Sequence, residues 1–131
     1  MCLSEQQFKN LYIKKKLKQS NNEVFCIETE ETVQGFPDVM ILDSNNKAYF
    51  YEFKISDKNG NIKFQPTQPA FYRKHTSMNV HVIAYNKATG CVHCFCTSEV
   101  FDKTSVYQLS NKATINLYTV EKYYESINSI S

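Results

Sequence analysis

Residues 39–54, with the sequence VMILDSNNKAYFYEFK, contain the pattern on which the fold depends. Two apolar runs lie on either side of residues 43–47, a stretch rich in the turn-forming residues Asp, Ser and Asn. Apolar runs separated by such a stretch predict a β-hairpin. Because side chains alternate along a strand, Glu52 and Lys54 are predicted to point to the same face of the second strand.

Asp38 lies directly before the first strand of this hairpin. Antiparallel pairing about the turn predicts that Asp38 lies opposite residue 52 or 53, close to Glu52. Carboxylate oxygens from two adjacent strands suit Mg²⁺ or Mn²⁺ and leave coordination positions for water and a phosphate. A lysine beside such a site, here Lys54, can orient an attacking water or neutralise developing charge. The pattern therefore predicts a divalent-metal site.

Helical and strand patterns surround the hairpin. Ser4 followed by Gln7 is typical of a capping box and predicts a helix that ends near residue 19. Thr67 is predicted to cap a second helix that ends near residue 76. Further strands are predicted at residues 24–27, 80–85 and 91–96, and an amphipathic helix at residues 120–127. This order predicts an α/β fold, with a mixed β-sheet flanked by helices.

The composition is typical of a folded globular protein. The 131 residues are 42% hydrophobic and 14% aromatic, which predicts a single domain over residues 1–131. No apolar run approaches the ~20 residues that span a membrane, and the N-terminus does not have the pattern of a secretion signal. We therefore expect no membrane partner and a cytoplasmic location. The net charge of +2 is too small to indicate nucleic-acid binding by itself.

A cluster of cysteines offers an alternative metal site. Cys91, Cys94 and Cys96 lie close to His93, and zinc ligands occur at such spacings. In an extended strand, however, Cys91 and His93 face one way while Cys94 and Cys96 face the other, so one ion cannot bind all four. Buried, reduced thiols are the favoured interpretation. His81 is likewise assigned to structure.

Three segments of the chain resemble a known nuclease family. Gly35-Phe36-Pro37-Asp38, Tyr51-Glu52-Phe53-Lys54 and Phe64-Gln65-Pro66-Thr67-Gln68 are similar to the G-x-P-D, E-x-K and S-P-x-Q segments of the VRR-NUC branch of the PD-(D/E)XK nucleases. The resemblance covers residues 5–85, and Gln65 stands where the family has serine. It implies a restriction-endonuclease-like core and a metal-dependent active site.

The resemblance also implies roles for individual residues. Asp38 and Glu52 would bind the metal ion, with the backbone carbonyl of Phe53 as a further ligand. Lys54 would assist the attacking water, and Gln68 would approach the site from the following helix.

Two further assignments come from related families. Recombination exonucleases contain a Q-x-x-x-Y element, which Gln68 and Tyr72 match at a spacing of one helical turn. Members of the superfamily often add a glutamate from the first helix, and Glu5 is the candidate here. Glu5 also has an ordinary interpretation, as an acid in the first helical turn favoured by the helix dipole.

Cationic residues on the two predicted helices are candidates for phosphate contacts. Lys14, Lys15 and Lys16 form either a solvated helix face or a phosphate-binding run. On the second helix, the candidates for contact with nucleic acid are Tyr72, Arg73, Lys74 and His75. The family resemblance favours DNA as the nucleic acid. RNA is not excluded, because both nucleic acids have a phosphate backbone.

The predicted function is metal-dependent hydrolysis of DNA phosphodiester bonds by an endonuclease. Some VRR-NUC-like proteins resemble Holliday-junction resolvases, which implies branched or structured DNA as the substrate. A symmetric junction needs two active sites, so a homodimer is expected for that substrate. The alternative is a non-catalytic module of the same fold that binds DNA or a protein partner.

Overall fold

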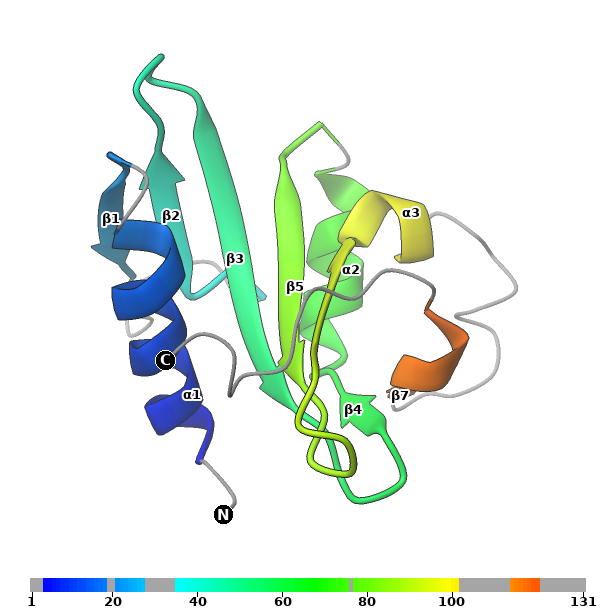
Figure 1. Ribbon diagram of the computed structural model, residues 1–131. Helices are drawn as coiled ribbons and strands as arrows, with labels where there is room; N and C mark the ends of the chain where they lie inside the picture. Colours follow the sequence, from blue (N-terminus) through cyan, green and yellow to red (C-terminus); the bar gives the residue numbers. More distant parts are fainter. Residues whose placement is uncertain (1–3, 19–20, 28–34, 76, 102–113, 121–131) are drawn as a thin grey trace.

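A five-stranded mixed sheet forms the centre of the molecule (Figure 1). The computed structural model describes residues 4–18, 21–27, 35–75, 77–101 and 114–120. The strands, in their order across the sheet, are β1 (Glu23–Cys26), β2 (Val39–Leu42), β3 (Ala48–Ile55), β5 (Val80–Tyr85) and β6 (Val92–Cys96). Only β3 and β5 pair in parallel, and the other neighbours pair antiparallel.

Strands β2 and β3 form the predicted hairpin. Val39 pairs with Tyr51 and Leu42 with Ala48. Continuing this register by one residue places Asp38 opposite Glu52, one of the two predicted alternatives. Buried and half-buried positions alternate along β2, as expected for a strand whose one face packs on a core. The hairpin therefore brings the two candidate carboxylates to neighbouring strands.

Helix α1 (Glu5–Tyr12) covers one face of the sheet. The predicted capping box is present, because Gln7 N donates to Ser4 Oγ at 3.1 Å and Ser4 N donates to Gln7 Oε1 at 2.9 Å. The helix continues as a π-helical turn, Ile13–Leu17, rather than as the regular helix that was predicted. The core on this side consists of Phe8, Tyr12, Ile13, Leu17, Val39, Ile41, Phe53, Ile83, Tyr85, Val92 and Cys94.

Helix α2 (Thr67–Lys74) covers the other face. The prediction that Thr67 caps this helix is wrong: Pro66 is the N-cap residue, and no cap side chain accepts a hydrogen bond there. Instead, Gln68 Oε1 accepts from Gln65 N at 2.9 Å, so a side chain within the helix bonds to the backbone that precedes it. The core on this side consists of Ile62, Phe64, Phe71, Tyr72, Val80, Val82, Ala84, Phe95, Ile115 and Leu117.

A second, two-stranded sheet was not predicted. Strand β4 (Asn61–Lys63) pairs antiparallel with β7 (Thr114–Asn116), and a 3-10 turn, Leu117–Thr119, follows. A short helix, α3 (Thr97–Phe101), lies after β6. The amphipathic helix predicted over residues 120–127 falls outside the described residues except for Val120. None of the described helices is long and apolar enough to cross a membrane.

Both helices begin at the Ile55 end of β3 and lead toward its Ala48 end. For α2, the chain that follows the helix reaches Asn79, whose carbonyl accepts from Phe50 N at 2.8 Å. For α1, the chain continues to Glu23, which pairs with Leu42 beside the Ala48 end. The residues early in each helix therefore lie near Lys54, and the residues late in each helix lie near the opposite end of the sheet.

Candidate active site

Gly35 brings the loop before β2 into contact with helix α2. Its φ of +86° lies in the left-handed region, and a Cβ at this position would lie 2.3 Å from the carbonyl oxygen of Thr67. No other residue can make this approach without displacing backbone. The next residue, Phe36, packs edge-on against Phe50 at 5.7 Å and Phe71 at 5.4 Å between ring centroids. The G-x-P-D segment is thus anchored to both β3 and α2.

Asp38 and Glu52 are held side by side at the start of β2 and near the end of β3. Phe53 N donates to Asp38 Oδ2 at 3.4 Å, a long contact that directs this carboxylate across the hairpin. The side chain of Glu52 is 4% exposed, and its Oε1 has no hydrogen-bond partner among the described residues. Burial raises the pKa of Glu52 to about 9, with a further contribution from the negative charge of Asp38.

Lys54 lies on the same face of β3 as Glu52, as predicted, and is fixed by helix α2. Its Nζ donates to Gln68 Oε1 at 2.9 Å and lies 4.8 Å from the centre of the Phe64 ring. The same Gln68 oxygen accepts from the backbone N–H of Gln65. That contact uses main chain, so the departure from serine at position 65 leaves it intact. The ammonium group of Lys54 opposes the rise in the pKa of Glu52.

Glu5, at the start of α1, lies within electrostatic reach of this cluster. The pKa of Glu5 is raised, chiefly by burial of its carboxyl group, while the charge of Lys54 lowers it and that of Asp38 raises it. Within the described part of the chain, no three His, Cys, Asp or Glu side chains are close enough together to hold a metal ion. Asp38 and Glu52 form the carboxylate pair of the candidate site, and Glu5 lies within electrostatic reach of both Asp38 and Lys54.

Tyr72 lies beneath the site rather than on its surface. It is 2% exposed, so the expectation that it contacts nucleic acid directly is wrong. Burial raises the pKa of Tyr72, and the negative charges of Glu52 and Asp38 raise it further, which places its hydroxyl close to the carboxylate pair. The Q-x-x-x-Y spacing thus brings both Gln68 and Tyr72 to the site, as side chains that contact protein.

The other candidate phosphate contacts lie away from the carboxylate pair. Arg73 and Lys74 are exposed in the last turn of α2, and His75 packs its ring on Phe71 at a centroid distance of 4.4 Å. On α1, Lys14 is exposed nine residues after Glu5, about 13 Å along the helix axis. The side chains of Lys15 and Lys16 lie outside what the structure describes.

The cysteine cluster has the alternation that the sequence predicts. Cys94 pairs with Ile83 and belongs to the core beneath α1, whereas His93 pairs with Ala84, which belongs to the core beneath α2. Burial lowers the pKa of His93. His81 stacks on Tyr51 with ring centroids 5.6 Å apart, consistent with its assignment to structure.

Two contacts at the site were not found from the sequence. One is the Phe64 ring against Lys54. The other joins the loops after β3 and β5: Ser56 Oγ donates to Asp57 O at 2.7 Å and accepts from Lys87 N at 2.9 Å. The polar stretch at residues 57–61 predicted a turn. The contact between this loop and the loop after β5 depends on which strands are neighbours in the sheet, and the sequence does not indicate that.

Similarity to known proteins is found at the level of structure. No protein-family model matches the chain, and no curated protein is significantly similar in sequence. Among solved structures, the chain is similar to Hjc of Archaeoglobus fulgidus, a Holliday junction resolvase from an archaeal hyperthermophile, with a TM-score of 0.58. The alignment covers 94% of this chain and 96% of that chain, at 9% sequence identity. The α/β fold predicted from the sequence is therefore confirmed, and it is the fold of this resolvase.

Proposed function

We propose that this protein is a metal-dependent endonuclease that hydrolyses phosphodiester bonds in branched DNA. The observation that carries the proposal is the buried carboxylate of Glu52, whose Oε1 has no hydrogen-bond partner among the described residues and which lies beside Asp38. A buried carboxyl oxygen without a hydrogen-bond partner costs folding free energy. Such a cost is common where a group serves chemistry rather than stability.

The residues fit a hard divalent cation. Asp38 and Glu52 offer carboxylate oxygens, and the family resemblance adds the backbone carbonyl of Phe53; oxygen ligands of this kind suit Mg²⁺ or Mn²⁺. When bound, the ion would supply positive charge beside a phosphodiester and acidify a nearby water. It would also hold Glu52 ionised, which its surroundings otherwise oppose.

The chain's own groups complete the chemistry. Lys54 carries an ammonium group that Gln68 holds at 2.9 Å, so its position is set before substrate binds. From there it can orient the attacking water or neutralise charge that develops on the phosphate. Gln68 and Tyr72 act as positioning residues, because the first contacts Lys54 and the second lies beside the carboxylate pair.

Branched DNA is proposed as the substrate because the fold is shared with a Holliday junction resolvase. A four-way junction is symmetric and presents two equivalent cleavage sites, so two copies of the chain would act on it together. Phosphate contacts rather than base contacts would give most of the affinity.

A cleavage assay tests this proposal. Purified protein with Mg²⁺ or Mn²⁺ is expected to cut four-way or flap DNA faster than linear duplex, single-stranded DNA or RNA of the same length. Asp38→Asn and Glu52→Gln are each expected to lower the rate by orders of magnitude while leaving the circular dichroism spectrum unchanged, because each removes a charged ligand and conserves shape. Binding of DNA without cleavage in any metal would instead favour a non-catalytic module.

A further inference from the structure

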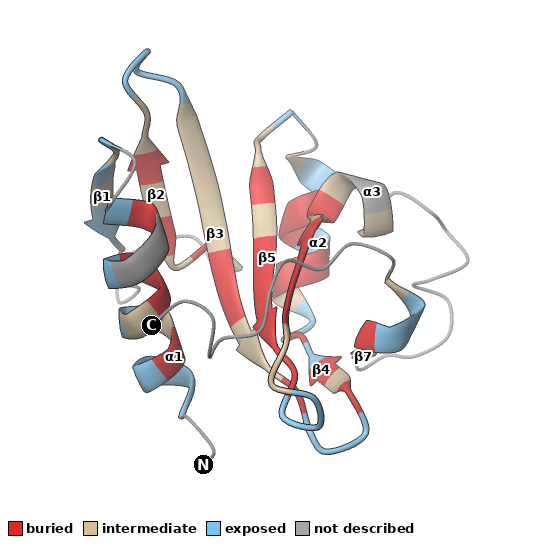
Figure 2. Cartoon of the chain, viewed as in Figure 1, coloured by how far each residue is buried: buried red, intermediate tan, exposed pale blue. Residues whose placement is uncertain are grey.

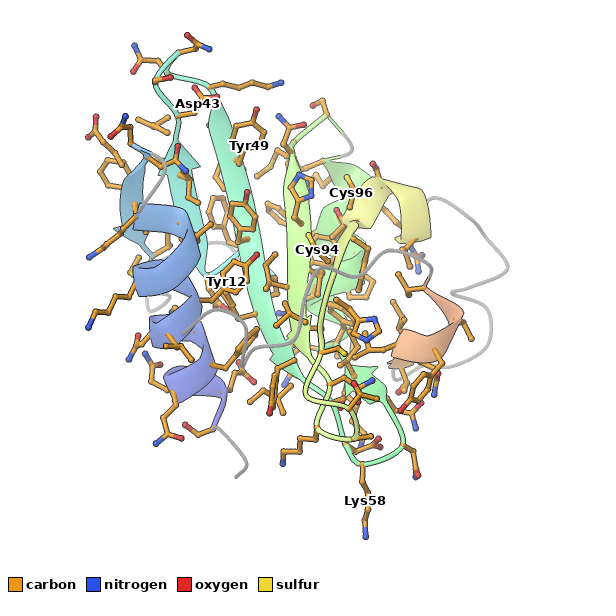
Figure 3. All side chains as sticks on the ribbon, viewed as in Figure 1. Tyr12, Asp43, Tyr49, Lys58, Cys94 and Cys96 are labelled. Carbon is orange, nitrogen blue, oxygen red and sulfur yellow. The ribbon has the colours of Figure 1, made fainter. Side chains whose placement is uncertain are left out.

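The turn beyond the Ile55 end of β3 is surrounded by three exposed lysines and an exposed tyrosine. Lys58 lies within the turn at residues 57–61 and extends from the lower end of the molecule in Figure 3. Figure 2 shows exposed loops at this end of the molecule. Lys63, Lys87 and Tyr118 are also exposed. We refer to Lys58, Lys63, Lys87 and Tyr118 as the lysine–tyrosine rim.

Contacts place all four residues around the same turn. Lys63 lies close enough to lower the pKa of Asp57. The backbone N–H of Lys87 donates to Ser56, whose hydroxyl in turn donates to Asp57 O. The ring of Tyr118 covers Gly60, where a Cβ would lie 2.6 Å from the nearest ring carbon. The acidic residue of this turn, Asp57, is turned toward the backbone, because its carboxylate accepts hydrogen bonds from the N–H groups of Asn59 and Asn61.

Hydrogen bonds hold the backbone at Tyr118, while its side chain is exposed. Its backbone N–H donates to Asn116 Oδ1 at 2.9 Å, and Asn116 Nδ2 donates to Asn61 Oδ1 at 2.8 Å and to Asn59 O at 3.2 Å. The residue is 58% exposed and is one of two large hydrophobic side chains classed as exposed in the described part of the chain. An exposed aromatic ring among lysines matches the chemistry of a nucleotide, which combines a flat base with a negative phosphate.

The rim lies next to the carboxylate pair along the chain. Lys58 follows Lys54 by four residues, which limits the distance between their Cα atoms to about 14 Å. That upper limit corresponds to about four nucleotides, since the phosphates of each strand of a duplex repeat every ~3.4 Å along the helix axis, and to fewer nucleotides in an extended strand. A DNA strand with one phosphate at Lys54 therefore reaches the rim within a few nucleotides.

We propose that the lysine–tyrosine rim binds an unpaired nucleotide of the DNA substrate, with Tyr118 stacked on its base and the lysines on the flanking phosphates. This inference rests on the proposed nuclease function and specifies it. In continuous duplex both faces of every internal base are covered by neighbouring bases, so Tyr118 can stack only where a strand leaves the duplex. The rim thereby selects branch points, flaps and splayed ends over linear duplex.

Binding of two fluorescent DNAs in EDTA, which prevents cleavage, tests the inference. One is a linear duplex, and the other is a splayed duplex with 2-aminopurine as its first unpaired base. Tyr118→Ala is expected to weaken binding to the splayed DNA about tenfold and binding to the duplex less than twofold. It should also abolish quenching of 2-aminopurine. Tyr118→Phe, which keeps the ring, is expected to behave as the wild type. Tyr118→Leu, which keeps apolar cover on Gly60, should behave as Tyr118→Ala.

The lysines have a matched control at the opposite end of the sheet. Replacing Lys58, Lys63 and Lys87 with alanine is expected to reduce the slope of log affinity against log salt by about two. Replacing Lys18 and Lys47, which are also exposed, should leave that slope nearly unchanged. If Tyr118→Ala weakens both DNAs equally or neither, the rim does not bind an unpaired base.

The cleavage assay separates this failure from failure of the proposed function. Tyr118 and the lysines of the rim lie outside the carboxylate pair. Metal-dependent cleavage that persists in the Tyr118 variants without a change in branch preference would overturn the rim alone. A wild-type protein that cleaves no DNA in any metal, and binds none in EDTA, overturns both.

Discussion

The turns at the two ends of β3 share one backbone arrangement and differ in what surrounds them. In residues 43–47, the Asp43 carboxylate accepts hydrogen bonds from the N–H groups two and four residues later, at 2.8 and 2.9 Å. In residues 57–61, the Asp57 carboxylate makes the same pair of contacts at 2.8 and 3.0 Å. The fourth residue of each turn has positive φ, 61° at Asn46 and 80° at Gly60. Figure 3 labels Asp43 and Lys58 at opposite ends of the molecule.

Their surroundings are different. Beside the first turn, Lys47 Nζ lies 5.3 Å from the centre of the Tyr49 ring, and the chain returns from β2 to β3. Beside the second, Lys54 is tied to Gln68, and Tyr118 covers the turn. The comparison teaches that the hydrogen bonds within a turn set the path of its backbone. Whether a turn lies beside the candidate active site depends instead on the neighbouring strand ends. The two ends of β3 therefore serve as test and control within one molecule.

Replacing the lysine at each end should have opposite outcomes. Lys54→Ala is expected to slow the chemical step by about a hundredfold or more, because a positioned proton donor or cation is lost. Affinity for Mn²⁺ should change little, since lysine is not a ligand. Lys47→Ala should leave both unchanged. Single-turnover cleavage at saturating metal, with Mn²⁺ titrations alongside, measures the two effects. Equal rates in Lys54→Ala and the wild type would remove Lys54 from the mechanism.

The stability of the metal-free protein should depend on pH through Glu52. The pKa of Glu52 is raised from the ordinary value of 4.5 to about 9 in the folded state. Between these two pH values Glu52 is protonated in the folded state and ionised in the unfolded state. The stabilisation that protonated Glu52 gives below pH 4.5 is therefore lost as pH rises toward 9.

Thermal unfolding in EDTA from pH 5 to pH 9 tests this sign. The Tm of the wild type is expected to fall across the range, and the fall should be smaller in Glu52→Gln, which cannot ionise. Asp57 supplies the control: hydrogen bonds from the backbone N–H groups of Asn61 and Asn59 lower its pKa, so Asp57→Asn should leave the slope of Tm against pH above 5 unchanged. A slope identical in the wild type and Glu52→Gln would contradict the raised pKa.

Substitution at the positive-φ position should distinguish the two turns by stability. Gly60→Ala is expected to lower the free energy of unfolding by about 1–2 kcal/mol from backbone conformation alone, and further because the new methyl group meets the Tyr118 ring. Asn46→Ala should cost less, about 1 kcal/mol, because Asn46 is exposed. Urea unfolding measures both. Equal losses would mean that Tyr118 does not press on Gly60.

The sequence predicted the elements whose determinants are local. The hairpin followed from residues 39–54 and the capping box from Ser4 and Gln7. The turn between the strands placed Asp38 opposite residue 52 or 53, and the register of the structure selects Glu52. The pairing of β4 with β7 was missed, because three-residue strands separated by some fifty positions leave no periodic signal. The cap of α2 was assigned wrongly to Thr67, because the side chain of Gln68 reaches back to the preceding loop instead.

The site was predicted in part for the same reason. Alternation along β3 placed Glu52 and Lys54 together, and that required no tertiary information. The direction of α2 relative to the site did require it. Gln68 lies in the first turn, beside Lys54, whereas Arg73 and Lys74 lie in the last turn. Helical periodicity in the sequence does not indicate which end of the helix lies near the site.

The smallest effect is expected for the cations at the far end of α2. Arg73 and Lys74 are exposed, but they follow Gln68 by five and six residues, about 8 Å along the helix. They would meet only DNA that continues from the carboxylate pair along this helix. Arg73→Ala with Lys74→Ala is expected to weaken binding to all DNA sequences alike, because phosphate contacts carry no base identity. The slope of log affinity against log salt should fall by about one, half the change expected for the three lysines of the rim. Fluorescence anisotropy of the Asp38→Asn protein across a salt series measures this without cleavage. If this slope changes as much as it does for the rim lysines, DNA lies along α2 as much as across the Ile55 end of β3. The two ends of the sheet would then not differ in DNA binding.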